Sequence, residues 1–116
     1  MRYSGEREYR ALLRRLREQA PPRYPVRIVR RSDPDNAGSC DLVRRGASWV
    51  FEIEIAKDAP AVLLVEILLH EWAHALAWGS RRKAPMHGRR YGEAWARCYR
   101  IWEPPFSWQR TRRQAA

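Results

Sequence analysis

The chain has 116 residues, which is enough for one domain with its own hydrophobic core and leaves little room for a second. Hydrophobic residues make up 45% of the sequence and charged residues 31%, a balance that excludes an intrinsically disordered chain and predicts a compact fold. The net charge of +10 favours contact with polyanions such as nucleic acid, although an arginine-rich surface can equally serve solubility alone.

The first half of the sequence predicts one helix followed by three strands. Residues 5–20 place apolar side chains at helical spacing between arginines and glutamates, and the prolines that follow end this amphipathic helix. Residues 26–30 alternate apolar and basic side chains, as a half-exposed strand does. After a run of turn residues, two more strands are expected over 40–44 and 48–56, joined by a short loop at 45–47.

The segment 48–56 has the clearest period-two pattern in the chain. Its apolar residues fall on one face and two acids on the other: Trp49, Phe51, Ile53 and Ile55 against Glu52 and Glu54. This pattern predicts a strand that is packed on one side only and lies near the edge of a sheet. We therefore expect a small, mostly antiparallel, three-stranded sheet.

The second half of the sequence predicts two helices separated by a basic loop. Asp58 is a plausible N-cap and Pro60 suits a first turn, so a buried central helix is expected over about 59–78. Residues 80–86 form the basic loop, and a last helix with one apolar stripe is expected over about 88–103. The expected fold class is therefore α+β, with a single domain over residues 1–116.

The C-terminal third concentrates the positive charge. From Gly79 to the end there are ten Lys and Arg residues and two Glu, a net charge of +8, and a basic tail begins at about residue 104. Cys40 and Cys98 match neither a paired-cysteine metal motif nor a disulfide framework, so we expect reduced thiols and a cytoplasmic location. The charged N-terminus resembles no secretory signal, and no apolar stretch is long enough to span a bilayer.

One motif in the central helix carries chemistry. His70-Glu71-Trp72-Ala73-His74 is the H-E-x-x-H pattern, in which the two histidines lie one helical turn apart and can bind one Zn²⁺ at about 2.0 to 2.1 Å. Glu71 flanks such an ion and can act as general base toward a water molecule on it. The alternative is a pair of core histidines satisfied by hydrogen bonds, but burying two imidazoles and a carboxylate in an apolar helix is costly.

A catalytic zinc also needs a third protein ligand. His87 is the one other histidine of the chain, thirteen residues after His74. Ala77 and Ser80 stand where the metzincin spacing requires Gly and His, so that class is excluded. Glu93, on the last helix, is the competing ligand, as in gluzincins, and either residue could instead be merely exposed to solvent.

Other residues near the motif have two interpretations each. Tyr91 is a candidate hydrogen-bond donor to the oxyanion, but core packing explains it as well. Glu66, one turn before His70, could orient that ring, or it could be solvated or paired with an arginine. Basic runs flank His87 and either attract a polyanion to the site or form a solvated loop: Arg81, Arg82, Lys83, Arg89 and Arg90.

The two histidine segments together resemble a known family. His70-Glu71-Trp72-Ala73-His74-Ala75, followed after a basic spacer by His87-Gly88-Arg89-Arg90-Tyr91, is similar to the SprT-like metallopeptidase domain over about residues 48–102. The resemblance implies a zincin-like peptidase core with one zinc ion held by His70, His74 and His87. In eukaryotic relatives it implies DNA-dependent cleavage of proteins crosslinked to DNA. The two cysteines of this chain do not supply the C-terminal zinc ribbon of many members.

The sequence therefore predicts a zinc-dependent endopeptidase with Glu71 as general base, acting on a protein or peptide, and its positive charge favours action near nucleic acid. One alternative is a small regulatory zincin with Glu93 as third ligand. The other is a basic protein on the same fold that binds nucleic acid, or serves in assembly, without catalysis.

Overall fold

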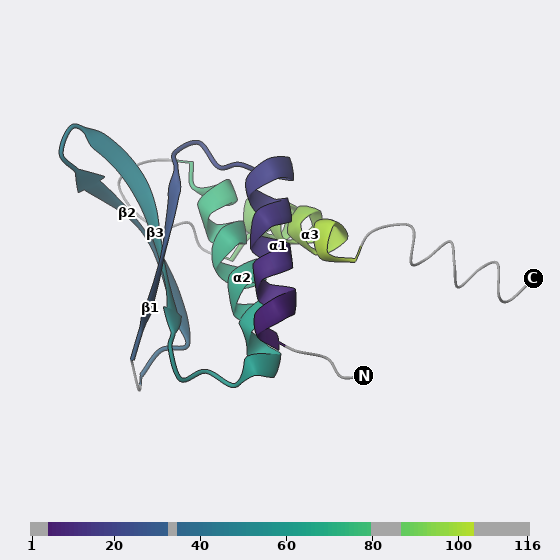
Figure 1. Cartoon of the computed structure of the whole chain (residues 1–116). Coiled ribbons are helices and arrows are strands. Elements are labelled where there is room, and N and C mark those ends of the chain that lie inside the picture. The colour runs from purple at the N-terminus through teal and green to yellow at the C-terminus, as the bar shows by residue number, and fades with distance from the viewer. Residues whose placement is uncertain (1–4, 33–34, 80–86, 104–116) are drawn as a thin grey trace, which may run out of the picture.

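The structure is a computed structural model that describes residues 5–32, 35–79 and 87–103. Three helices lie on one side of a three-stranded sheet (Figure 1), which confirms the α+β class. None of the described helices is long and apolar enough to cross a membrane. The elements in chain order are α1 (Gly5–Gln19), β1 (Val26–Arg31), β2 (Gly38–Arg45), β3 (Ser48–Ala56), the short 3₁₀ helix η1 (Ala61–Leu63), α2 (Leu64–Ala77) and α3 (Arg89–Trp102).

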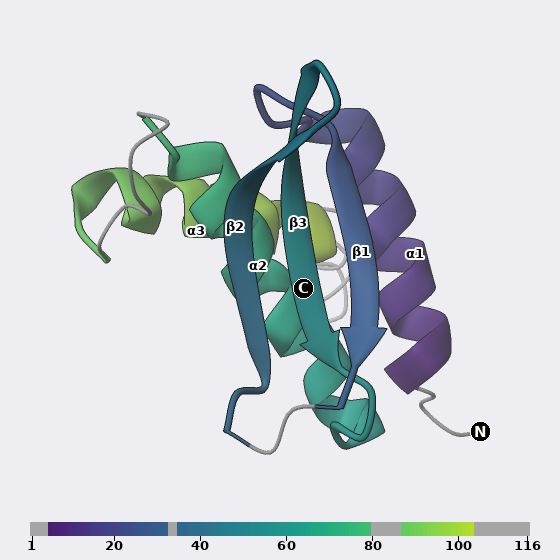
Figure 2. The same ribbon diagram turned by 90° about the vertical axis from the view of Figure 1, so that its left-hand side faces the viewer.

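The sheet is mixed, so the expectation of a mostly antiparallel sheet was wrong. Its strand order is β1-β3-β2, with β1 parallel to β3 and β2 antiparallel to β3 (Figure 2). The β2–β3 hairpin turns between the paired residues Arg45 and Ser48, and Gly46 there has φ of 62°, a left-handed conformation that glycine adopts without strain. The chain then places β3 between the two earlier strands.

The position of β3 in the middle of the sheet corrects the expectation of a strand near an edge. Phe51, Ile53 and Ile55 are fully buried toward the helices. On the opposite face, which no described element covers, Glu52 and Glu54 form ion pairs with arginines of both neighbouring strands: Arg27, Arg31 and Arg45. Because only one face of this sheet is covered, a central strand alternates as strictly as an edge strand does.

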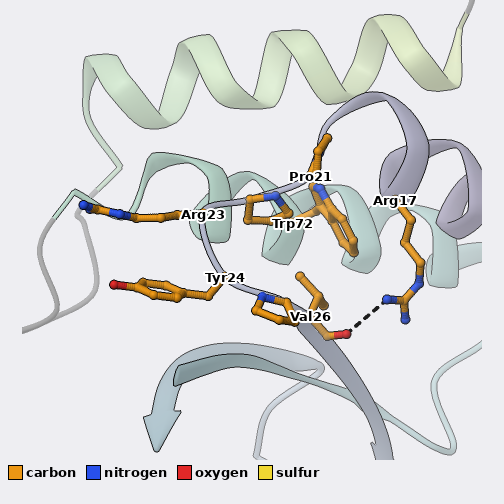
Figure 3. A pocket seen from close by; sticks show the side chains of 8 residues that line it. Arg17, Pro21, Arg23, Tyr24, Val26 and Trp72 are labelled. Carbon is orange, nitrogen blue, oxygen red and sulfur yellow. Dashed lines mark hydrogen bonds between the residues drawn. The ribbon is translucent and has the colours of Figure 1, made fainter. Parts of the chain in front are cut away.

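The helix α2 is the centre of the core, as its apolar circumference predicted. It packs against α1, α3, β2 and β3, and ten of its 14 residues are buried. The indole Nε1 of Trp72 donates to the carbonyl oxygen of Ala20 at 2.8 Å, which ties the end of α1 to α2. Arg17 of α1 in turn donates to the carbonyl oxygen of Val26 at 3.1 Å, at the start of β1 (Figure 3).

The start of α2 differs from the prediction. The expected helix began at about residue 59, whereas the structure has η1 at Ala61–Leu63 and the α-helix begins at Leu64. Pro60 precedes η1 with an extended backbone, φ −57° and ψ 139°, so it lies outside the helix rather than in its first turn. The first turn after it is therefore 3₁₀, a common form at helix ends.

Both cysteines are free thiols buried in the core, Cys40 on β2 and Cys98 on α3. Burial raises the pKa of the Cys40 thiol, and it raises the pKa of Cys98 to about 12. A thiol is nucleophilic as the thiolate, so both side chains are unreactive packing residues in the folded chain.

Candidate metal centre

The histidines of the H-E-x-x-H segment lie on one side of α2. His70 and His74 are separated by one helical turn, and their ring centroids are 4.9 Å apart. Both rings are half-buried, whereas Glu71 between them is only 6% exposed and is the one buried charged side chain among the described residues. The segment thus has two partly exposed imidazoles and one buried carboxylate.

His87 reaches the same place from the other side. It lies two residues before the start of α3, and its ring centroid is 5.0 Å from that of His70 and 4.7 Å from that of His74. The Nε2 atoms of His74 and His87 are 3.0 Å apart. One ring nitrogen from each of the three histidines lies within 4.8 Å of the others, so the three side chains are positioned to hold a metal ion.

The chemistry of this donor set fits such an ion. Two nitrogens at about 2.0 to 2.1 Å from a tetrahedral ion are about 3.4 Å apart, close to the Nε2–Nε2 separation of 3.0 Å. Metal ligation needs neutral imidazoles. Burial, with a smaller contribution from the neighbouring imidazoles, lowers the pKa of His74 to about 4 and also lowers that of His70, so both rings are neutral at pH 7.

Tyr91 fixes the orientation of one of these rings. Its hydroxyl oxygen is 3.0 Å from Nδ1 of His70, and the hydroxyl donates to the carbonyl oxygen of His70 at 3.4 Å. A phenol that donates to this carbonyl can also accept from Nδ1–H, and in that tautomer Nε2 of His70 keeps its lone pair for a metal ion. Burial, with smaller contributions from Glu71 and Cys98, raises the pKa of Tyr91 to about 12, so the phenol stays protonated.

The sequence interpretation missed this contact. It considered Tyr91 as an oxyanion donor or a core residue, and Glu66 either as the partner of His70 or as a solvated or arginine-paired side chain. The structure places Glu66 exposed to solvent, with no hydrogen bond to His70 among the described contacts. A signal was present in the sequence, because Tyr91 lies only four residues after His87 and is therefore held near it.

Glu71 lies in a confined, apolar setting. Burial is the main cause that raises its pKa to about 7, and the charge of Asp41 adds to the effect. β2 presses closely on it: a Cβ on Gly38 would be 3.3 Å from Cγ of Glu71 and 2.6 Å from Cγ2 of Ile67. Glycine at this position lets the strand backbone approach the helix. Glu71 and His70 also border an open pocket of about 340 Å³.

The competing ligand, Glu93, lies elsewhere on α3. Its exposed carboxylate forms an ion pair with Arg89 at 3.4 Å, and it belongs to a separate pocket with Leu76 and Arg97. It is absent from the converging group that the described residues form. Arg89 and Arg90 are exposed next to His87, whereas the basic run at 81–83 and the tail from about 104 lie outside the described residues.

A second pocket, of about 240 Å³, lies apart from the three histidines (Figure 3). It is formed by the turn between α1 and β1, with Arg17, Pro21 and Tyr24 around the edge of Trp72. Trp72 follows His70 by two residues and therefore points to another side of α2. The described residues that line this pocket include no histidine and no carboxylate.

Comparison with known proteins gives one result. The model of the SprT-like family matches residues 7–112, which is most of the chain. No curated protein and no solved structure matches the chain. The match includes α2, α3 and all three converging histidines. The chain therefore belongs to the SprT-like family.

Proposed function

We propose that this chain is a zinc-dependent endopeptidase of the zincin type. The observation that carries the proposal is the convergence of His70, His74 and His87 beside the buried carboxylate of Glu71. Three neutral imidazoles form the ligand set of a catalytic zinc site, and they leave a fourth position for water or substrate. Family membership is consistent with this chemistry.

The residues of the chain have distinct roles in the proposed reaction. Zinc, when bound, supplies a Lewis acid that polarises a substrate carbonyl and lowers the pKa of a water molecule. Glu71 accepts the proton of the attacking water and passes it to the leaving amine. Tyr91 keeps the His70 ring in place through the hydrogen bond at Nδ1.

Replacing the general base tests this proposal. Glu71→Gln keeps the size of the side chain and removes its basicity, so we expect cleavage of an unfolded protein substrate to fall by about 100-fold or more. The content of bound zinc should stay at that of the unchanged chain. Equal cleavage by the two proteins would contradict the role of Glu71, and no cleavage by either would favour a binding protein on this fold.

The regulatory zincin with Glu93 as third ligand remains the alternative peptidase. Replacing His87 and Glu93 separately with Ala distinguishes the two ligand sets, because only the true ligand sharply weakens zinc binding. The position of Glu93 in an ion pair with Arg89, away from the histidines, favours His87.

We also propose that nucleic acid binds near the metal centre. Arg89 and Arg90 are exposed at the start of α3, next to His87, and can contact phosphate groups. A fluorescent single-stranded oligonucleotide should bind the full chain with a salt dependence that weakens in the Arg89→Ala, Arg90→Ala double variant. An unchanged affinity and salt slope would contradict this placement.

A further inference from the structure

The open pocket beside Glu71 has a wall that the proposed reaction does not use. His70 and Glu71 form one side of it, and α2 continues the wall one turn earlier with Glu66 and Ile67. Trp95 of α3 also lines it. We call this space, of about 340 Å³, the Glu66 pocket. Because His70 and Glu71 border it, a side chain that enters it belongs to a residue next to the bond to be cleaved.

The charge of the Glu66 pocket is opposite to that of the chain. The sequence has 23 Lys and Arg residues against 13 Asp and Glu, yet the described residues that line the pocket include two carboxylates and no basic side chain. Charges that are farther apart than about 8 Å are largely screened at physiological ionic strength. A cation inside the pocket lies within contact distance of Glu66, whereas the arginines of the described ranges are not part of the lining.

Glu66 is available for such a contact. The acids of β3 are occupied, because Glu52 and Glu54 form ion pairs with neighbouring arginines. Glu66 is exposed and forms no ion pair or hydrogen bond with any residue in the described ranges 5–32, 35–79 and 87–103. Its carboxylate can therefore accept a guanidinium or ammonium group without displacing an internal partner.

The rest of the wall suits the stem of a long basic side chain. Ile67 is 9% exposed and offers an apolar surface. Trp95 is half-buried, and its ring stacks on Tyr99 at a centroid distance of 5.0 Å and an angle of 15°, which holds the indole in place. Lys and Arg bury their methylene stems on apolar surfaces while the charge stays at the rim, and a cation over an indole gains further attraction.

We infer that the Glu66 pocket binds an arginine or lysine side chain of the substrate, next to the scissile bond. The stem lies against Ile67 and Trp95, and the charged group contacts Glu66. The peptide nature of the ligand rests on the proposed function, but binding of the side chain itself requires no turnover.

A titration followed by NMR tests this inference independently of cleavage. N-acetyl-arginine amide and its uncharged analogue N-acetyl-citrulline amide are added to the labelled, zinc-loaded full chain. We expect the amide signals of Glu66 and Ile67 and the indole signal of Trp95 to shift, with the arginine compound binding about fivefold more tightly, as suits a partly exposed ion pair. Glu66→Gln should abolish this preference. Glu18→Gln, which removes the same charge outside the pocket, should retain it.

The outcomes separate this inference from the proposed function. Equal affinity for the two compounds, an unchanged preference in Glu66→Gln, or no shift at the pocket would overturn the inference. A peptide library cleaved by the zinc-loaded chain gives the second readout. Cleavage without a basic preference overturns the Glu66 pocket and leaves the peptidase intact, whereas arginine binding without any cleavage supports the pocket and contradicts the peptidase.

Discussion

The hydroxyl of Tyr91 on α3 lies 3.0 Å from Nδ1 of His70 on α2, and it connects the two helices at the point where the three imidazoles meet. The same phenol ring lies 4.6 Å, between centroids, from the rings of both His74 and His87. Tyr91 therefore contacts every candidate metal ligand, and its hydroxyl lies within hydrogen-bond distance of a ring nitrogen of one of them.

Tyr91→Phe should weaken zinc binding without unfolding the chain. The change keeps the ring that packs on the imidazoles and removes the hydrogen bond at His70, and loss of such outer partners lowers metal affinity by about 10- to 100-fold. Competition with a fluorescent zinc chelator measures the dissociation constant. Tyr24→Phe is the control, because Tyr24 lies beside Phe51, away from the histidines. Equal loss of affinity in both variants would contradict the positioning role.

Gly38→Ala should destabilise the fold, because Gly38 of β2 packs closely on α2 beside Glu71. The added Cβ would be 2.6 Å from Cγ2 of Ile67, 3.2 Å from the carbonyl oxygen of Glu54 and 3.3 Å from Cγ of Glu71, so the Ile67 side chain or the backbone of β2 must shift. We expect a loss of about 1 to 3 kcal/mol in the free energy of unfolding, as for other overpacked sites. Gly92→Ala is the matched control, since its Cβ meets nothing within 4 Å. In the helix α3 that change should stabilise by about 0.5 to 1 kcal/mol.

Replacing Trp72 and Trp78, the two buried tryptophans of the described residues, with Phe should lower the free energy of unfolding by different amounts. Trp72 donates a hydrogen bond to the carbonyl oxygen of Ala20, whereas Nε1 of Trp78 is buried without a partner in the described structure. Trp72→Phe removes a bond and leaves a buried acceptor unsatisfied, so it should destabilise by about 1 to 3 kcal/mol more than Trp78→Phe. Urea denaturation followed by circular dichroism measures both changes. A larger loss in Trp78→Phe would contradict the role of this hydrogen bond.

The buried thiols should make the fold sensitive to alkali. Burial raises the pKa of Cys98 to about 12, above that of an unfolded thiol near about 8.5, so the folded state holds the proton more tightly. The contribution of the protonated thiol is complete below the unfolded pKa. Stability then falls by up to about 1.4 kcal/mol per pH unit as the pH rises toward the folded value.

Cys98→Ala isolates this contribution. Urea denaturation of the two proteins from neutral to alkaline pH should show a shallower loss of stability in the variant, because the variant has one fewer thiol to ionise on unfolding. Parallel pH curves for the two proteins would contradict the assignment.

The sequence predicted those parts of the fold that local patterns determine. Periodicity located the three helices and three strands, and the H-E-x-x-H spacing together with the remaining histidine identified the converging group. The neighbours of each strand were not predictable. The alternation of apolar and polar residues over 48–56 indicates which face of the strand is buried. A central strand of a sheet that is covered on one side has the same pattern as an edge strand.

Contacts between residues that are far apart in the sequence could not be predicted either. The partner of His70 could have been Glu66, one turn away on the same helix, or a residue of another element, and spacing alone does not choose between them. The packing of α3 against α2 decides for Tyr91. The lack of a basic residue among the described residues that line the Glu66 pocket likewise depends on where β2 and α3 meet α2.

The most direct test of the metal centre is elemental analysis of the purified full chain beside its His87→Ala and Glu93→Ala variants. We predict about one zinc per chain in the unchanged protein and in Glu93→Ala, and a sharp loss in His87→Ala, because a catalytic zinc site needs three protein ligands. A chain without bound zinc, or a His87→Ala variant that keeps it in full, would contradict the account.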